Sequence, residues 1–233
     1  MFLSYIRIAF LSLVTPLMLF TNSYAQVNDS LRIGTVDTVV IKDDDKLNTG
    51  LARMKTGDKF PSVYFYNLKG EKYGVDSIFK TRPVIFVSCS YSCPIFRYNT
   101  KRLYRHMRKK SKNYDVYFIY LLEAHPLVGS PYGQVRDSSR QNKKDGIFVT
   151  QQKYIKQRLV SAVKTRHDFN LFGKVLVDNE NNDYFRKLHA GPNSYLAFSK
   201  EGILIEQRNW FRRHGYIKPI KRNVNSPAME LKK

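Results

Sequence analysis

The chain has 233 residues and a formal charge of +21, and 42% of its residues are hydrophobic and 14% aromatic. This composition excludes a chain that is disordered throughout, and the surplus of Lys and Arg favours an acidic or anionic partner. With only two cysteines, Cys89 and Cys93, the chain is neither a small scaffold held by several disulfides nor a zinc site of four thiolates. Any thiol chemistry is therefore confined to one short segment.

Residues 1–25 have the pattern of an export signal. A single cation, Arg7, precedes the apolar run Ile8–Phe20, and the small residues Ser23 and Ala25 follow at cleavage spacing. At ~1.5 Å per residue the run spans about 20 Å, less than the roughly 30 Å hydrocarbon core, which favours a cleaved signal over an uncleaved anchor. We expect cleavage after Ala25, a periplasmic or secreted protein, and a mature chain of one domain with extensions.

Residues 26–55 are polar and contain the acidic cluster Asp43–Asp45, which predicts a flexible leader. The folded domain is expected over 56–216. It opens with the alternating segment VYFYN and a Lys69-Gly70 turn, a pattern typical of a β-hairpin.

The apolar run Val84–Val87 predicts a strand that is buried on both faces, as in a parallel sheet. A helix is expected over 94–112, because its apolar residues, from Phe96 to Met107, fall on one face of a 3.6-residue period. Lysines and arginines form a second stripe on this helix.

Strands and helices alternate after this helix. We expect a buried strand over 115–123, a long loop or candidate lid over 126–146, a helix over 150–166, a strand over 174–178, a short helix, two strands within 191–207, and a basic tail over 217–233. This order predicts a mixed α/β sheet flanked by helices, in the thioredoxin-like arrangement at its larger, peroxiredoxin-like size.

Cys93 lies between the end of the first buried strand and Pro94, a residue favoured in the first helical turn. Cys93 is therefore expected at a helix N-cap, where unpaired N–H groups and the positive end of the helix dipole stabilise a thiolate. The basic stripe that begins at Arg97 adds to this effect, so we expect the pKa of Cys93 to lie below its free value of ~8.5. The pattern favours a nucleophile over the alternative of an inert core thiol.

Cys89 precedes Cys93 by four residues, a wider spacing than that of the thioredoxin dithiol. If Cys89 still lies in the strand, its side chain can point away from Cys93, so both a resolving thiol and a core residue remain open. Ser90, Tyr91 and Ser92 lie between the cysteines and are candidate substrate contacts. The Ser90 hydroxyl stands at the spacing at which peroxiredoxin-type sites bind a peroxide oxygen, and a turn serine is the alternative.

Glu123 and His125 end the second buried strand, and their spacing of two places both side chains on the same face. The carboxyl ends of parallel strands meet at one edge of a sheet, where Cys93 also lies. The pair is therefore a candidate acid and base for the thiol, with a structural histidine as the alternative. Pro192 precedes the strand SYLAFS, at the position where thioredoxin-like folds carry a cis-proline, and an ordinary turn proline is the alternative.

These segments together resemble the iodothyronine deiodinase family over about 57–216. SYSCPIFR is similar to the family's selenocysteine-Pro-Pro-Phe segment, with Cys93 at the selenocysteine, and VYFIYLLEAHP is similar to its strand ending in Glu-Ala-His. The resemblance implies that Cys93 attacks the outgoing group, that Glu123 and His125 handle protons, and that Arg158 contacts the substrate or has a structural role. It also implies that an external thiol reductant supplies electrons, and we expect no bound cofactor or metal.

The leading hypothesis is an exported thiol oxidoreductase in which Cys93 acts on a disulfide, a peroxide or a carbon–halogen bond, with a thiol reductant or a disulfide-bearing protein as its partner. The alternative is a redox-silent protein that binds an anionic polymer or a membrane surface through the cations of 94–112 and of the tail. Export, and the lack of an aromatic-rich RNA motif in the sequence, argue against nucleic acid as a partner.

Overall fold

The computed structural model describes residues 36, 38–42, 54–128 and 139–208, with the backbone alone described for 101–106. The expected export signal and basic tail lie outside the described residues. Within the described ranges, no helix is both long and apolar enough to cross a membrane.

In this part of the chain, the strands form one mixed sheet in the order β2-β1-β5-β4-β3-β6-β7. The strands are β1 (Tyr64–Asn67), β2 (Lys72–Gly74), β3 (Val84–Cys89), β4 (Asp115–Tyr120), β5 (Lys174–Asp178), β6 (Tyr195–Phe198) and β7 (Leu204–Arg208). The helices are the 3-10 turn η1 (Val75–Ser77), α2 (Pro94–Lys110), α3 (Arg140–Lys144), α4 (Ile155–Asp168) and α5 (Asp183–Leu188).

The central strands β5, β4 and β3 are parallel, and an antiparallel pair of strands extends the sheet on each side. All of β3, and β4 beyond its first residue, is buried, which explains why both sequences are apolar. Cys89 lies opposite Tyr120 in this register, so the predicted parallel pairing of the two strands is confirmed. The β3-α2-β4 crossover, with antiparallel β6 and β7 beside β3, confirms the predicted thioredoxin-like fold class.

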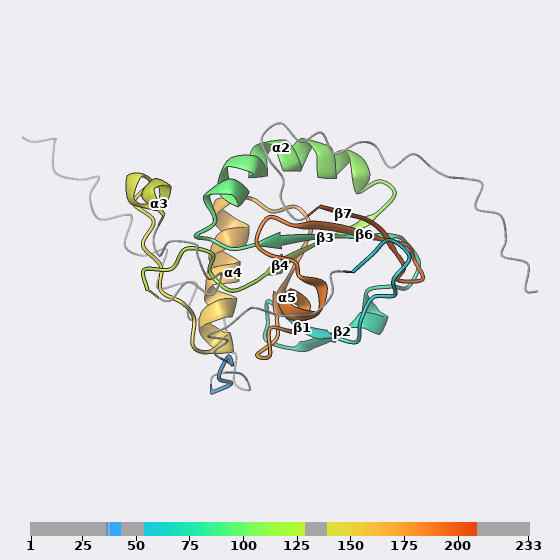
Figure 1. The fold of residues 1–233 in the computed structure, drawn as a ribbon, viewed down its shortest axis with the longest axis horizontal. Coiled ribbons are helices and arrows are strands. Elements are labelled where there is room, and N and C mark those ends of the chain that lie inside the picture. The colour runs from blue at the N-terminus through green and yellow to red at the C-terminus, as the bar shows by residue number, and fades with distance from the viewer. Residues whose placement is uncertain (1–35, 37, 43–53, 129–138, 209–233) are drawn as a thin grey trace, which may run out of the picture.

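Alternate side chains of β3 point into two core layers. Ile85, Val87 and Cys89 belong to the layer that also contains side chains of α2 and α4, whereas Val84 and Phe86 pack in the layer that contains α5. Figure 1 shows α2 along one side of the strands and α5 on the other side. The direction of the Cys89 side chain is thus set by the pleat of β3.

Part of the expected flexible leader packs on the core. Val36 and Ile41 are buried in the layer of α2 and α4. The Ile41 amide donates to the Lys153 carbonyl at 2.8 Å, and the Ile155 amide donates to the Val39 carbonyl at 3.0 Å. The prediction of a flexible leader is therefore corrected for these residues, because two apolar side chains and a backbone bridge hold them at the start of α4.

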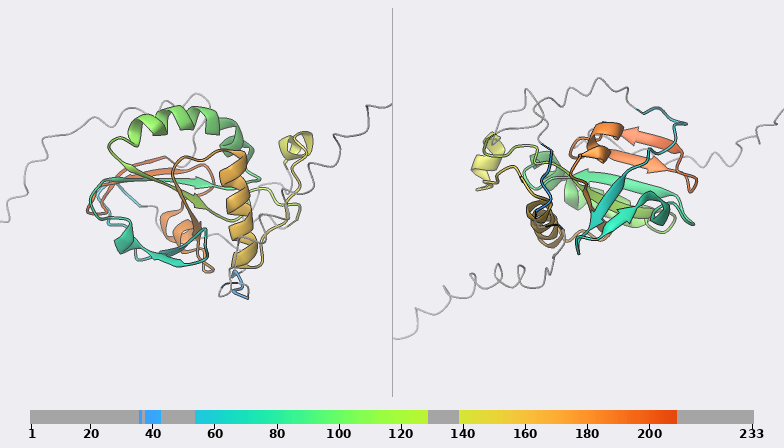
Figure 2. Two further views of the ribbon diagram at one scale, coloured as in Figure 1. Left: turned by 180° about the vertical axis from the view of Figure 1, so that it is seen from behind. Right: turned by 90° about the horizontal axis from the view of Figure 1, so that it is seen from below.

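The long loop expected over 126–146 contains the helix α3. Residues 129–138 lie outside the described ranges, but α3 begins directly after them and is capped by Ser139, whose hydroxyl oxygen accepts from the Asn142 amide at 3.0 Å. Such a cap stabilises a short helix in a segment too polar to show a periodic apolar pattern. Figure 2 shows α3 set apart from the strands at one end of the molecule.

Candidate functional site

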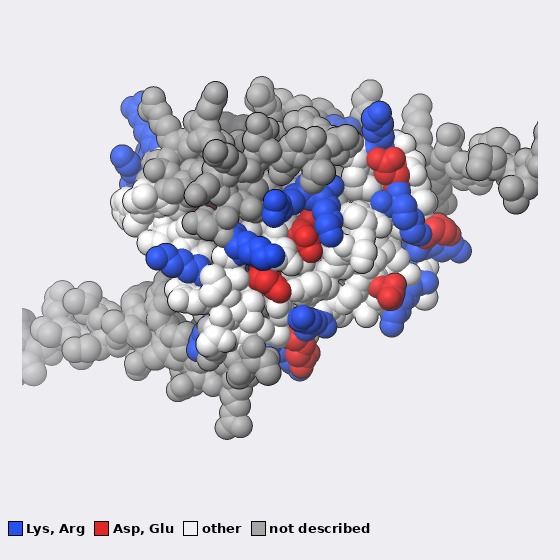
Figure 3. Space-filling view, turned by 60° about the horizontal axis from the view of Figure 1, so that its bottom comes forward, with Lys and Arg blue, Asp and Glu red and all other residues white. Residues whose placement is uncertain are grey.

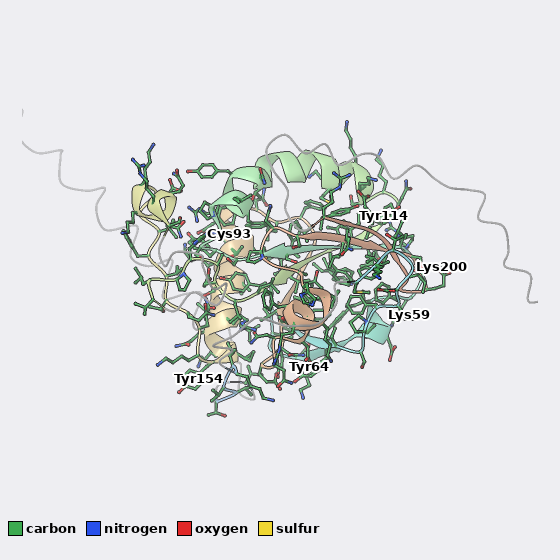
Figure 4. The ribbon with its side chains drawn as sticks, viewed as in Figure 1. Lys59, Tyr64, Cys93, Tyr114, Tyr154 and Lys200 are labelled. Carbon is green, nitrogen blue, oxygen red and sulfur yellow. The ribbon has the colours of Figure 1, made fainter. Side chains whose placement is uncertain are left out.

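Cys93 is the N-cap residue of α2, as predicted, with Pro94 in the first helical turn. Its sulfur accepts a hydrogen bond from the Phe96 amide at 3.5 Å. The extended backbone of Cys93 and the missing N–H of Pro94 start the helix at this point. Figure 4 places Cys93 where α2 and α4 approach each other, at the end of the molecule that carries α3.

The expected depression of the Cys93 pKa is not found. The residue is only 1% exposed, and burial raises the pKa of the thiol to about 11. The amides of Phe96 and Ile95 and the charge of Arg97 lower this pKa, but they are outweighed by burial. The start of α2 therefore lowers the pKa of Cys93 as predicted. The net pKa is nevertheless raised, because the sulfur is shielded from water.

We expect the rate of Cys93 alkylation by iodoacetamide to rise about tenfold per pH unit from pH 6 to pH 9, without an inflection, because only the thiolate reacts. A raised folded-state pKa also means that this thiol stabilises the fold fully below its ordinary pKa of ~8.5, and that this contribution is lost as the pH rises toward 11. Alkylation resolved by mass spectrometry measures the profile. An inflection below pH 8.5 would contradict the dominance of burial.

Cys89 ends β3 and is fully buried, in the same core layer as Cys93. Its thiol donates to the Ile119 carbonyl at 3.5 Å. Burial, followed by the charges of Glu123 and Cys93, raises the pKa of the Cys89 thiol well above its usual range. Both cysteines are free thiols on the same side of the sheet. Cys89 is thus still in the strand, it shares a core layer with Cys93, and the charge of Cys93 acts on its thiol.

Glu123 is fully buried, and its charge acts on both thiols. It accepts hydrogen bonds from the Ser92 amide at 2.8 Å, from Gln152 Nε2 at 3.0 Å and from the Tyr120 hydroxyl. Its charge raises the pKa of each cysteine, although burial contributes more. The three donors explain how a carboxylate is tolerated in the core.

Glu123 and His125 do not end a strand, because β4 stops at Tyr120, opposite the last residue of β3. The two residues lie in the loop that follows, so the alternation that was expected to place them on one face does not apply. His125 is half-buried. Its amide donates to Ser92 Oγ at 2.9 Å, which ties this loop to the loop between the two cysteines.

The candidate contacts Ser90 and Ser92 are buried, and their hydroxyl oxygens accept from backbone amides of the Glu123 loop. Ser90 Oγ accepts from the Ala124 amide at 3.1 Å, as Ser92 Oγ does from His125. The two serines therefore hold the two loops of the site together.

Tyr91 anchors the loop between the cysteines to α4. Its hydroxyl donates to Asp168 Oδ2 at 2.8 Å, and its ring lies 5.7 Å from that of Phe169. Lys164 Nζ lies 4.8 Å from the centre of the same ring and pairs with Asp168 at 2.5 Å. The Tyr91 hydroxyl is thus bound to the Lys164–Asp168 ion pair in the last turn of α4.

Arg158 is buried in α4 and donates hydrogen bonds to the segment that follows β5. Its guanidinium donates to the carbonyls of Asp178 and Asn179 and to Asn182 Oδ1 at 2.8 to 3.1 Å. These acceptors form the turn between β5 and α5. The contacts correspond to the structural role that the sequence left open for Arg158.

The peptide bond before Pro192 is trans, since the described residues contain no cis peptide bond. The expected cis-proline is therefore corrected. Pro192 stands in a tight turn closed by a hydrogen bond from the Ser194 amide to the Gly191 carbonyl at 3.1 Å, and Asn193 has φ of 70°. This is the geometry of a type II turn, which places trans proline before a residue with positive φ. The Asn193 amide donates to the Ser88 carbonyl of β3 at 2.8 Å.

Three polar residues of the site were not predicted from the sequence: Tyr120, Asn142 and Gln152. Tyr120 belongs to an apolar strand, and Asn142 and Gln152 occur in polar segments that show no pattern before folding. All three are buried, and each contacts a loop that flanks Cys93 or the carboxylate of Glu123. A hydrophobic period in the sequence does not reveal a single amide side chain that becomes buried through contacts with residues distant in the chain.

No family model matches this chain, and no curated protein matches it. Among solved structures it is similar to the thioredoxin domain of a thiol-disulfide oxidoreductase from Bacteroides vulgatus, with 15% identity and a TM-score of 0.42 over 66% of this chain and 89% of that one. It is also similar to a thiol peroxidase from Chromobacterium violaceum (11% identity, TM-score 0.42, 68% and 78% covered) and to a peroxiredoxin-like protein from Aquifex aeolicus (14%, 0.41, 67% and 77%). These scores are low, so the functional argument rests on this chain's own residues.

Proposed function

We propose that this chain is an exported thiol-dependent oxidoreductase in which Cys93 is the nucleophile. One observation carries the proposal: the sulfur that caps α2 shares a core layer with a second thiol, and a buried carboxylate acts on both. Two thiols in one core layer can form the mixed and internal disulfides of thiol–disulfide exchange, and a carboxylate beside them can accept a proton. The fold supports the same class of chemistry, and export rests on the pattern of residues 1–25.

The step that these groups support best begins when Glu123 takes the proton of the Cys93 thiol. The thiolate attacks one sulfur of a substrate disulfide, the substrate S–S bond breaks, and the leaving thiolate takes a proton from His125 or water. Cys89 attacks the Cys93 sulfur and breaks the mixed disulfide; the proton of the Cys89 thiol passes to the second substrate thiolate, which leaves as a thiol, and a Cys89–Cys93 disulfide remains. An external dithiol then donates two electrons and two protons, which restores both cysteines.

The same nucleophile supports two other substrates. Attack on a peroxide oxygen breaks the O–O bond, leaves Cys93 as a sulfenic acid and releases an alcohol or water. The resemblance to deiodinases adds a carbon–halogen bond, in which the halogen passes to the Cys93 sulfur and the carbon takes a proton. In both reactions an external thiol reduces the modified cysteine.

The proposal is tested by incubating the purified mature protein with dithiothreitol and each of three substrates: an insulin-type protein disulfide, an alkyl peroxide and an iodinated phenol. We expect catalysed turnover of the disulfide above the rate with dithiothreitol alone. If the protein turns over the alkyl peroxide or the iodinated phenol instead, that compound identifies its class of substrate. A protein that accelerates none of the reactions is not the proposed enzyme.

His125→Ala is expected to lower turnover by on the order of 10² to 10⁴ through the loss of a general acid, with little change in thermal stability. The backbone amide that ties the loop to Ser92 remains in this variant. Steady-state kinetics and a melting curve measure the two effects. If stability falls by several kcal/mol while turnover per folded molecule is unchanged, the histidine is structural.

A second function is favoured by one specific observation, the near-complete burial of both thiols, which is typical of inert core cysteines. A redox-silent protein would then use its positive charge to bind an anionic surface. On the face drawn in Figure 3, however, Lys and Arg side chains alternate with Asp and Glu and form no single-sign patch. Binding of the protein to anionic vesicles at 0.15 M salt, without turnover of any of the three substrates, would support this second function.

A further inference from the structure

α3 contacts the two loops that flank Cys93 through one side chain, and this side chain is completely buried. Asn142 is 0% exposed, whereas its neighbours Arg140, Lys143 and Lys144 are exposed. A buried amide on an otherwise solvated helix of five residues requires partners for both of its polar atoms.

Asn142 finds these partners on three segments around the thiol. Its Oδ1 accepts from the Arg97 guanidinium at 2.9 Å, and its Nδ2 donates to the Ser92 carbonyl at 2.9 Å. The same Nδ2 lies 3.4 Å from the His125 carbonyl. Ser92 precedes Cys93, and Arg97 lies one helical turn beyond it. One side chain therefore joins α2, the cysteine loop and the loop of Glu123 and His125.

The Arg97 guanidinium is held in a position where its charge acts on Cys93. Its side chain is only 8% exposed and also contacts the Tyr91 carbonyl at 3.1 Å and Asp145 at 2.7 Å. Asp145 follows α3 and accepts hydrogen bonds from Tyr98 and Gln141 as well. The α3 segment is thus fastened at both Asn142 and Asp145, and only Asn142 contacts the loops of the site.

We propose that Asn142 is a positioning residue that clamps the two loops and Arg97 around Cys93 and keeps water from the sulfur. The effect of Asn142 on catalysis rests on the proposed function of Cys93. Removing the amide leaves the Ser92 carbonyl and one Arg97 N–H without their partner, and water is the available substitute. Water between the loops favours the thiolate and loosens the arrangement of Glu123 and His125 relative to the sulfur.

Two variants and a matched control separate this role from a general structural one. Asn142→Ala removes all three contacts. Asn142→Asp keeps an oxygen for Arg97 but loses the donor to Ser92 and His125. Gln141→Ala, one residue away, removes an amide that donates to Tyr98 and Asp145 and, within the described residues, to neither loop of the site. The measurement is the pH profile of iodoacetamide alkylation, followed separately for Cys93 and Cys89 by mass spectrometry.

We expect Asn142→Ala and Asn142→Asp to raise the rate of Cys93 alkylation at pH 7 by on the order of tenfold, which corresponds to a thiol pKa lowered by about one unit. Cys89, which is held in β3, stays protected, and Gln141→Ala matches the wild type. Turnover of the assigned substrate falls in the two Asn142 variants although the thiol is more reactive. A more reactive Cys93 thiol together with a lower turnover indicates that the positioning of the site has been lost.

The proposal is overturned if the Asn142 variants leave the Cys93 profile unchanged, or if Gln141→Ala changes it equally. It is also overturned if Cys89 and Cys93 become reactive together in both variants, since Asn142 then holds the fold and not the site. Alkylation needs no substrate. A wild-type chain without turnover would therefore refute the proposed function and leave this test intact.

Discussion

Replacing Cys93 by serine is expected to lower turnover by at least on the order of 10³-fold, because a serine hydroxyl forms no thiolate and cannot form a mixed disulfide. The fold should persist, since serine is a preferred N-cap residue whose hydroxyl can accept from the Phe96 amide as the sulfur does. Steady-state turnover and a urea unfolding curve are the two measurements. Turnover by Cys93→Ser within a few-fold of the wild type would remove Cys93 from the mechanism.

Cys89→Ser is the matched control for this experiment, because it removes the other thiol of the same core layer. If turnover passes through an internal disulfide, this variant stops after one exchange and accumulates a mixed disulfide on Cys93. Mass spectrometry of the oxidised wild-type protein distinguishes the routes, since a loss of two hydrogens in the peptide that contains both cysteines indicates a bridge. Full activity of Cys89→Ser would show that Cys89 is a core residue only.

Arg158→Ala is expected to have the largest effect on stability, a loss of about 3–5 kcal/mol, because it breaks a buried charged network. The variant leaves the carbonyls of Asp178 and Asn179 and Asn182 Oδ1 without their donor. Burial raises the pKa of the Asp178 carboxyl to about 6, and Arg158 acts in the opposite direction. Urea unfolding, followed by fluorescence at several pH values, measures the loss.

The Arg158→Ala loss should be smaller at pH 5 than at pH 8. A buried carboxyl with a raised pKa stabilises the fold most below its unfolded pKa and loses this contribution as the pH rises through the folded value. Without the guanidinium the folded pKa rises further, so the variant is penalised most where Asp178 must be charged. Arg166→Ala, an exposed arginine on the same helix, is the control and should change stability by no more than about 0.5 kcal/mol. Equal losses in the two variants would contradict a buried network at Arg158.

The pairing of β3 with β4 and the start of α2 at Cys93 both follow from local sequence. A continuous apolar run such as VIFV is typical of a strand in a sheet that is covered on both faces, as central parallel strands joined by crossover helices are. Pro94 cannot extend a strand or sit inside a helix, so it marks the first helical turn and leaves Cys93 as its cap. These effects act within a few residues, and the sequence therefore predicts the position of the nucleophile.

The protonation of Cys93 and the partners of Glu123 were decided only by the tertiary structure. Burial of the sulfur depends on loops that are distant in sequence, and it outweighs the local effect of the helix start on the pKa. Gln152 and Asn142 reach the site from segments that show no apolar period, and their role exists only once those segments pack. The bond before Pro192 has the ordinary trans form, which fits the turn that joins Gly191 to Ser194. Local chemistry therefore specifies which residue caps the helix, whereas solvation and long-range hydrogen bonds decide what that residue can do.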